Sequence, residues 1–141
     1  VVDYKTGGRL RAYAKEGIPE EALELHNLPE DEYTGALESM AKNLKGFQLY
    51  TYMLMLHGRD EIPLEHLDAE YVFLRETEDK NRRVPVFKDS LSPEERAEQI
   101  RRFRLHLDAL LRDIFLRPNF LPIPDESNCK HCPLRTPCGN I

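Results

Sequence analysis

The sequence predicts an α/β fold, in which strands alternate with helices. Short runs rich in β-branched and aromatic residues, typical of strands, occur at residues 1–5 and 70–75. They alternate with two long segments, 36–57 and 93–117, in which apolar residues recur every three or four positions, as on one face of a helix. These strands are few for the number of apolar positions, so we expect the elements to lack part of their sheet.

The composition excludes several classes of protein. The chain has 141 residues, 40% of them hydrophobic, which is enough for one domain with a core. No apolar run is long enough for a membrane span, so we expect no membrane partner. The net charge of −5 argues against a general polyanion binder, although local basic patches can still bind nucleic acid. The three cysteines, all in the last 13 residues, favour a reducing compartment such as the cytoplasm over a disulfide scaffold.

The first half of the chain is expected to form a strand, a surface connection and a helix. The strand at residues 1–5 is followed by two glycines. Residues 15–35 are acidic and rich in turn formers, and we expect a surface connection with one helical turn at 20–25. The helix over 36–57 is predicted to end at Gly58, since glycine commonly terminates helices.

The second half is expected to form two strands and a long helix. Residues 70–75 are nearly continuously apolar, which indicates an interior strand, and 82–87 form a weaker one. Ser92 begins the long helix with a capping box completed by Glu95, and Pro118 ends it. Its predicted buried stripe comprises Ala97, Ile100, Phe103, Leu107, Leu110, Leu111 and Ile114. We divide the chain into residues 1–118 and a proline-rich, cysteine-containing tail, 119–141.

Asp3 and Lys5 are the first candidate site residues. Side chains alternate along a strand, so both point to one face and Tyr4 to the other. One interpretation is an ion pair on a solvated strand. This interpretation is favoured for a D-x-K motif taken alone, because so short a motif is weak evidence for a site. The other is a hydrolytic site, in which Asp3 binds Mg²⁺ or Mn²⁺ through oxygen and Lys5 polarises the attacking water.

Gln48 and Tyr52 are the second pair of candidates. They lie four residues apart, and therefore on one face of the predicted helix. Gln48 interrupts an apolar stretch, where an amide is either a satisfied core group or a ligand for something polar.

These four residues together resemble the RecB-type branch of the PD-(D/E)XK nuclease superfamily. Asp3–Gly7 matches its D-x-K-T-G strand, and Gln48–Tyr52 matches its Q-L-x-x-Y helix, in the same order. The resemblance implies a Mg²⁺- or Mn²⁺-dependent DNA exonuclease of repair and recombination, attached to or partnered with a helicase. It implies that Asp3 and the Tyr4 carbonyl bind the metal and that Lys5 is the catalytic lysine. Gln48 and Tyr52 would steady the active site and the DNA backbone.

The cysteines form the third motif, Cys129-x2-Cys132-x5-Cys138. This spacing suits zinc or an iron–sulfur cluster, and His131 and His106 are the nearest further candidate ligands. AddB-like helicase-associated nucleases of the same superfamily carry C-x2-C-x5-C at this place. The resemblance therefore implies a 4Fe–4S cluster completed by a fourth, upstream cysteine.

The same resemblance predicts that the chain is the C-terminal part of a restriction-endonuclease-like core, a mixed sheet flanked by helices, without its N-terminal helix and strands. We therefore expect the isolated chain to be nearly inactive and to self-associate through an exposed sheet edge. Two other functions remain open. The first is that of an inactive nuclease-fold subunit, which binds DNA or acts as a scaffold. The second is that of a zinc-binding interaction module, in which the D-x-K motif is fortuitous.

Overall fold

The computed structural model describes residues 1–5, 18–44, 47–78 and 82–118. The cysteine tail, with Cys129, Cys132 and Cys138, therefore lies outside the described residues. In chain order the elements are the strand β1 (Val2–Lys5), the 3-10 helix η2 (Glu20–Asn27), the helices α1 (Glu30–Asn43) and α2 (Phe47–Asp60), the 3-10 helix η3 (Leu64–His66), the strands β2 (Glu70–Phe73) and β3 (Arg83–Pro85), and the helix α4 (Pro93–Leu116).

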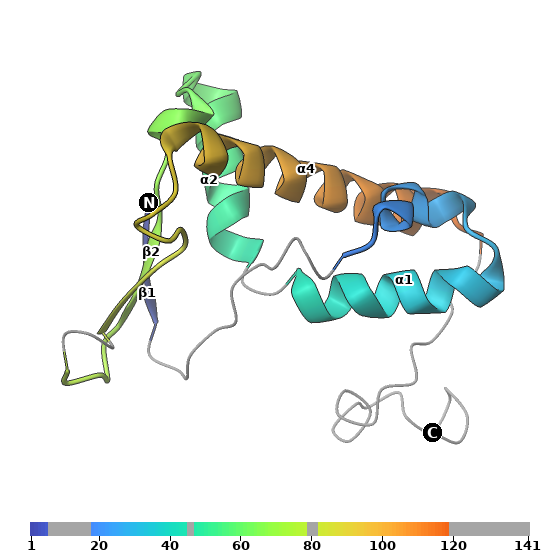
Figure 1. Ribbon diagram of the computed structural model, residues 1–141, viewed down its shortest axis with the longest axis horizontal. Coiled ribbons are helices and arrows are strands. Elements are labelled where there is room, and N and C mark those ends of the chain that lie inside the picture. The colour runs from blue at the N-terminus through green and yellow to red at the C-terminus, as the bar shows by residue number, and fades with distance from the viewer. Residues whose placement is uncertain (6–17, 45–46, 79–81, 119–141) are drawn as a thin grey trace.

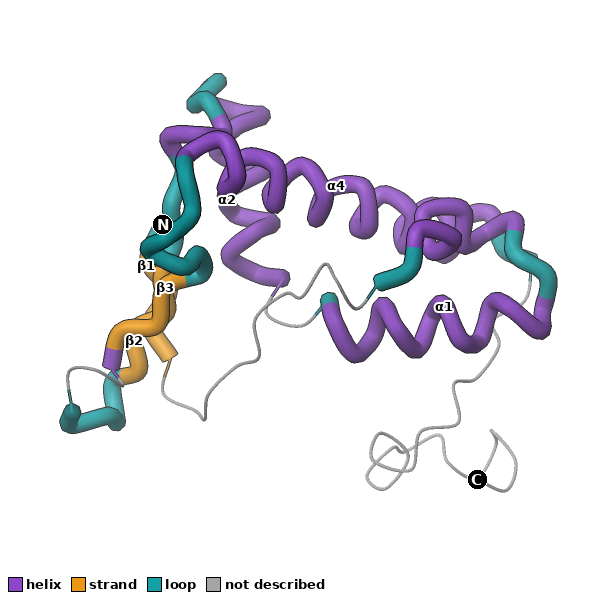
Figure 2. Tube along the Cα trace, in the orientation of Figure 1, coloured by secondary structure: helices purple, strands orange, loops and turns teal. Residues whose placement is uncertain are grey.

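The described strands form one mixed sheet in the order β1-β2-β3. β1 runs parallel to β2 and β3 runs antiparallel to it. The apolar run at 70–75 is thus the central strand, as its sequence predicted. The helices α1, α2 and α4 lie to one side of the sheet, and α4 extends from the sheet to the opposite end of the molecule (Figures 1 and 2). The α/β fold class expected from the sequence is confirmed.

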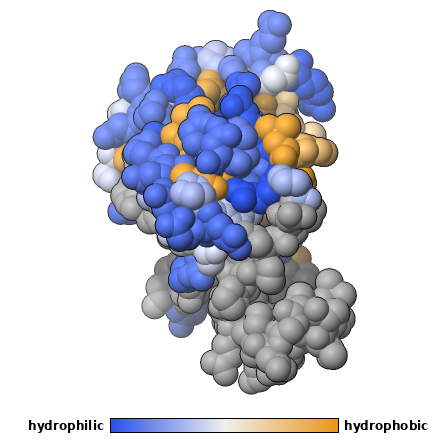
Figure 3. Space-filling model, turned by 90° about the vertical axis from the view of Figure 1, so that its right-hand side faces the viewer, coloured by the Kyte–Doolittle hydropathy of each residue, from blue (hydrophilic) through white to orange (hydrophobic). Residues whose placement is uncertain are grey.

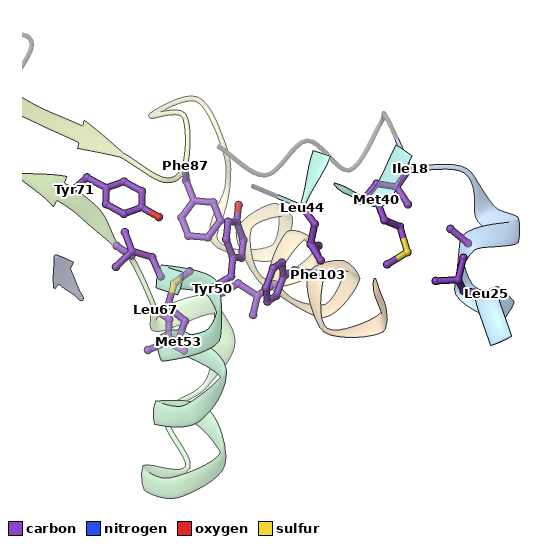
Figure 4. Packing of buried hydrophobic residues seen from close by; sticks show 14 of the residues in the cluster. Ile18, Leu25, Met40, Leu44, Tyr50, Met53, Leu67, Tyr71, Phe87 and Phe103 are labelled. Atoms are coloured by element: carbon purple, nitrogen blue, oxygen red, sulfur yellow. The ribbon is translucent and has the colours of Figure 1, made fainter. Parts of the chain in front are cut away.

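The core begins between the sheet and the helices and continues along them to η2 and α1, where Leu25 and Met40 are buried (Figure 4). Tyr50 of α2 stacks on Phe103 of α4, with ring centroids 4.9 Å apart, and meets the edge of Phe87 at 5.7 Å. Tyr71 and Phe73 supply the β2 face of this core and are 5% and 2% exposed. Since strand residues two apart share a face, the inner face of the sheet is the one that carries these two rings.

The predicted helix over 36–57 is wrong in its extent, because this region contains two helices. α1 begins at Glu30, where acidic residues in the first turn (Glu30, Asp31 and Glu32) favour a helix N-terminus. Gly58 does not end α2, which continues to Asp60; the left-handed position follows at Glu61, with a φ of 54°. A glycine inside an exposed helical turn costs only about 1 kcal/mol, so the turn tolerates it.

The predicted surface connection at 15–35 is also wrong over residues 18–35, the part of it that the structure describes. The helical turn near Glu20 is present as η2, but Ala22 and Leu25 are fully buried, and η2 packs extensively on α4. The segment is rich in acidic residues, so its composition indicates an exposed segment. The two buried apolar positions, which anchor it, are too few to change that prediction. η2 is therefore part of the core.

The start of α4 is as predicted and its buried stripe is correct only in part. The Glu95 amide donates to Ser92 Oγ at 3.2 Å, and the Ser92 amide donates to Glu95 Oε2 at 2.8 Å, which completes the capping box. Leu111 and Ile114 are exposed, whereas His106, Ala109 and Asp113 are buried in their place. Figure 3 views the end of the molecule to which the last turns of α4 extend, and shows apolar areas among hydrophilic ones. None of the described helices is long and apolar enough to span a membrane.

Candidate active site

The site begins with two side chains on the inner face of β1. Asp3 pairs in register with Tyr71, and Lys5 with Phe73, so both point toward the helices. Their side chains are 17% and 23% exposed. Tyr4, between them, is 65% exposed and lies on the outer face.

Lys5 links the strand to α2. Its Nζ atom lies 2.6 Å from Asp3 Oδ2 and donates a hydrogen bond to Gln48 Oε1 at 2.7 Å. An ammonium group can only donate, so the carbonyl oxygen of Gln48 must face Lys5 and its amide nitrogen must face away. The polar residue in the apolar stretch of α2 is therefore a partner of the strand lysine, 43 residues earlier in the chain.

Tyr52 continues the same chain of hydrogen bonds. Gln48 Nε2 donates to the Tyr52 hydroxyl at 2.6 Å, across one turn of α2. Because the hydroxyl accepts this bond, it retains its own hydrogen for an acceptor outside the chain of contacts. Tyr52 is 39% exposed, so such an acceptor can come from solvent or from a ligand. The structure thus brings all four predicted residues together.

The Asp3 carboxylate has the character of a cation ligand. Its Oδ2 atom is buried and receives no properly oriented hydrogen bond from the described residues, although Lys5 lies beside it as an ion-pair partner. A carboxylate oxygen suits a hard divalent cation, which binds oxygen, and among the described residues its partner is the Lys5 ammonium at 2.6 Å. The described residues contain no group of three or more His, Cys, Asp or Glu side chains that could hold a metal ion. Asp3 therefore fits as one ligand of a larger set.

The backbone carbonyl of Tyr4 points in a different direction from the Tyr4 side chain. The carbonyls of Val1 and Lys5 accept hydrogen bonds from Glu70 and Leu74, on the β2 side. Carbonyls alternate between the two edges of a strand, so the Tyr4 carbonyl points to the outer edge of β1. It is thus directed away from the sheet ladder, as a backbone oxygen ligand must be.

One residue of this site was not predicted from the sequence. Tyr71 pairs with Asp3 in register, and its ring centroid lies 5.8 Å from Lys5 Nζ. Its only sequence signal is an aromatic residue in a buried strand, which also describes an ordinary core residue. His106, considered as a further ligand of the cysteine motif, is fully buried in α4.

A carboxylate and a lysine on one strand of a mixed α/β sheet, joined to an amide and a phenol on a helix, form a site suited to phosphate-ester chemistry. The comparison with known families agrees: the PD-(D/E)XK nuclease superfamily matches residues 1–139, and the chain belongs to this superfamily. Its members are generally nucleases and typically use divalent metal ions, so this is a nuclease-type domain with DNA as its implied substrate. No curated protein and no solved structure matches the chain.

Proposed function

We propose that the chain forms part of a metal-dependent DNA exonuclease domain that acts with a helicase in repair or recombination, in the cytoplasm. The observation that carries the proposal is the position of Lys5 Nζ, 2.6 Å from Asp3 Oδ2 and 2.7 Å from Gln48 Oε1. A surface ion pair would need no third partner, whereas this ammonium is held by groups from two elements.

Each residue of the candidate site has its own role in the proposed cleavage of DNA. Asp3 and the Tyr4 carbonyl provide oxygen ligands, and the remaining ligands come from outside the described residues. A divalent cation bound there would polarise the phosphate and supply a nucleophilic water at neutral pH. Lys5 orients the water and offsets the negative charge that develops on the phosphate. Gln48 holds Lys5 in place, and the Tyr52 hydroxyl donates its hydrogen to a backbone phosphate oxygen of the DNA.

The first prediction concerns Lys5. In the full-length protein, Lys5→Ala should lower the rate of Mg²⁺-dependent DNA cleavage by about a thousandfold, because charge stabilisation in the transition state is lost. Asp3→Ala should have an effect of the same order, since it removes a metal ligand. The measurement is release of nucleotides from a labelled DNA duplex, with circular dichroism to check folding.

Lys42→Ala is the matched control. Lys42 is also a lysine paired with a carboxylate, Glu38, but it lies on the surface of α1, with a side chain 65% exposed. Its loss should leave the cleavage rate unchanged. A Lys5→Ala protein that cleaves as fast as the Lys42→Ala protein would refute the mechanism.

The second prediction concerns Cys129, Cys132 and Cys138, for which we propose a 4Fe–4S cluster with a fourth thiolate from upstream. Full-length protein purified without oxygen should be brown and contain about four irons, because thiolate-ligated clusters absorb visible light. Cys138→Ser should remove the colour. Colourless protein with one bound zinc would replace the cluster by a structural zinc site. Such a result would leave the proposal for Lys5 untouched.

An inactive DNA-binding or scaffolding subunit is the second candidate function. The observation that favours it is that Asp3 is not accompanied by two further metal-ligating side chains among the described residues. An inactive subunit would bind labelled DNA equally well with and without Mg²⁺ and would release no nucleotides.

A further inference from the structure

Tyr71 lies directly behind the proposed site. It stands on the central strand β2, opposite Asp3 in the parallel register, and is 5% exposed. Figure 4 shows its ring reaching from the strand toward the helices. The side chain therefore lies beside the strand that carries Asp3 and Lys5.

The ring of Tyr71 faces Lys5. The distance of 5.8 Å between the ammonium nitrogen and the ring centroid is within the range of cation–π attraction. Lys5 therefore has three partners from three elements: Asp3 on its own strand, Gln48 on α2 and the aromatic face on β2. A long flexible side chain with partners in three directions is confined to a small volume.

The hydroxyl of Tyr71 serves a second element. Burial and the negative charge of Asp3 raise the pKa of Tyr71, while a hydrogen bond with the backbone of Leu49 opposes the rise. Leu49 follows Gln48 in the first turn of α2, where backbone N–H groups have no partner within the helix. The same side chain that flanks Lys5 thus also anchors the helical turn that carries Gln48.

We propose that Tyr71 is a positioning residue, which holds the Lys5 ammonium and the first turn of α2 at the separation that the site requires. Its role in cleavage rests on the proposed nuclease function, but its effect on the geometry of Lys5 does not. Two variants separate its two contacts. Tyr71→Phe retains the ring beside Lys5 and loses the hydroxyl, and Tyr71→Leu loses both.

The test uses the full-length protein labelled with ¹³C at the lysine ε carbons. The ring current of Tyr71 shifts the Lys5 resonance, which is assigned by its absence from the Lys5→Arg protein. Tyr71→Leu should move this resonance toward the position of a solvated lysine, and Tyr71→Phe should leave it nearly in place. For cleavage we expect about a tenfold loss of kcat for Tyr71→Phe and a hundredfold loss for Tyr71→Leu, with little change in KM.

Tyr50→Phe is the matched control. Tyr50 is also buried, at 2% exposure, and its hydroxyl donates to Gln99 Oε1 on α4. Its replacement should leave both the Lys5 resonance and kcat unchanged. An unmoved Lys5 resonance in Tyr71→Leu, or equal losses of kcat in Tyr71→Phe and Tyr50→Phe, would overturn the proposal. If the unmodified protein cleaves no DNA, the nuclease proposal fails, and the Lys5 resonance still decides the positioning role.

Discussion

At the scale of single residues, protonation of the buried His106 opposes folding. It is fully buried in α4, and burial, aided by the charge of Arg102, lowers its pKa from 6.5 to about 4. The unfolded chain therefore binds a proton at a higher pH than the folded one. The neutral form stabilises the fold above pH 6.5, and this contribution is lost as the pH falls toward 4.

The resulting prediction is a pH-dependent free energy of unfolding. Between pH 6.5 and 4.5, His106 should contribute a slope that approaches about 1.4 kcal/mol per pH unit. Chemical denaturation at several pH values, followed by circular dichroism, measures it. His106→Gln should flatten the slope, whatever its effect on stability at pH 7. His66→Gln, at an exposed histidine, should leave the slope unchanged, and equal slopes in both variants would contradict this assignment.

The four site residues could be predicted because each obeys a local rule. Asp3 and Lys5 share a face through strand alternation, and Gln48 and Tyr52 through helical spacing. What joins the two pairs is the contact between Lys5 and Gln48, which the resemblance implied and local spacing could not show. Tyr71 obeys the strand rule as well, but its role depends on the register of β1 against β2. No pattern within one segment contains that information.

At the scale of elements, the predicted boundaries were most accurate where a single strong signal marked the start of an element. The capping box at Ser92 and Glu95 placed the start of α4 to the residue. The region before α2 carried two signals in conflict, because the apolar spacing runs on from 36 to 57 while the chain forms two helices. Periodicity records which positions are buried, and two successive helices packed on the same core can share one apparent period.

Buried polar residues account for the differences between the predicted and the observed buried stripe of α4. Asp113 and His106 occupy core positions of α4 that the hydrophobic pattern assigns to leucine and isoleucine. Asp113 is tolerated there because its two carboxylate oxygens are bound by Tyr33 and Arg117. A pattern of apolar residues cannot reveal a carboxylate that accepts a hydrogen bond from a residue 80 positions away and pairs with an arginine one turn away.

At the scale of the whole molecule, α4 connects the sheet to the far end, where η2 and α1 pack (Figure 1). A polar cluster fastens this end. Tyr33 of α1 donates to Asp113 Oδ2 at 2.8 Å, and Arg117 donates to Asp113 Oδ1 at 2.7 Å. Arg117 also donates to the carbonyl of Leu25 in η2 and lies 3.6 Å from the centroid of the Tyr33 ring. The Asp113 carboxylate and the Arg117 guanidinium group thus hold η2, α1 and the end of α4 together.

The cluster also affects Tyr33. Burial raises its pKa to about 12, helped by the hydrogen bond to Asp113 and its charge and opposed by the charge of Arg117. Tyr33 consequently remains a neutral donor throughout the physiological range. The cluster then contains one negative and one positive charge, and removal of Arg117 leaves the charge of the buried Asp113 without compensation.

The last prediction is that Arg117→Met lowers the free energy of unfolding by about 3 kcal/mol, because Asp113 stays buried and charged. The matched control is Arg104→Met. Arg104 also pairs with an aspartate four residues away on α4, but the side chains of Arg104 and Asp108 are 63% and 50% exposed. Its loss should cost less than about 1 kcal/mol, as for other surface pairs. Both values come from urea denaturation at pH 7.

A double variant identifies the cause of the loss. Asp113→Asn in the Arg117→Met background removes the uncompensated charge and still offers the Tyr33 hydroxyl an acceptor. It should recover part of the lost stability, whereas a loss that came only from the missing arginine side chain would not be recovered. Because the cluster joins η2 and α1 to the helix that reaches the sheet, the single variant should first release these two elements. Hydrogen exchange should therefore accelerate at Leu25 and Tyr33 before it does so at Tyr71, and equal acceleration at all three residues would show instead that the two ends of the molecule unfold together.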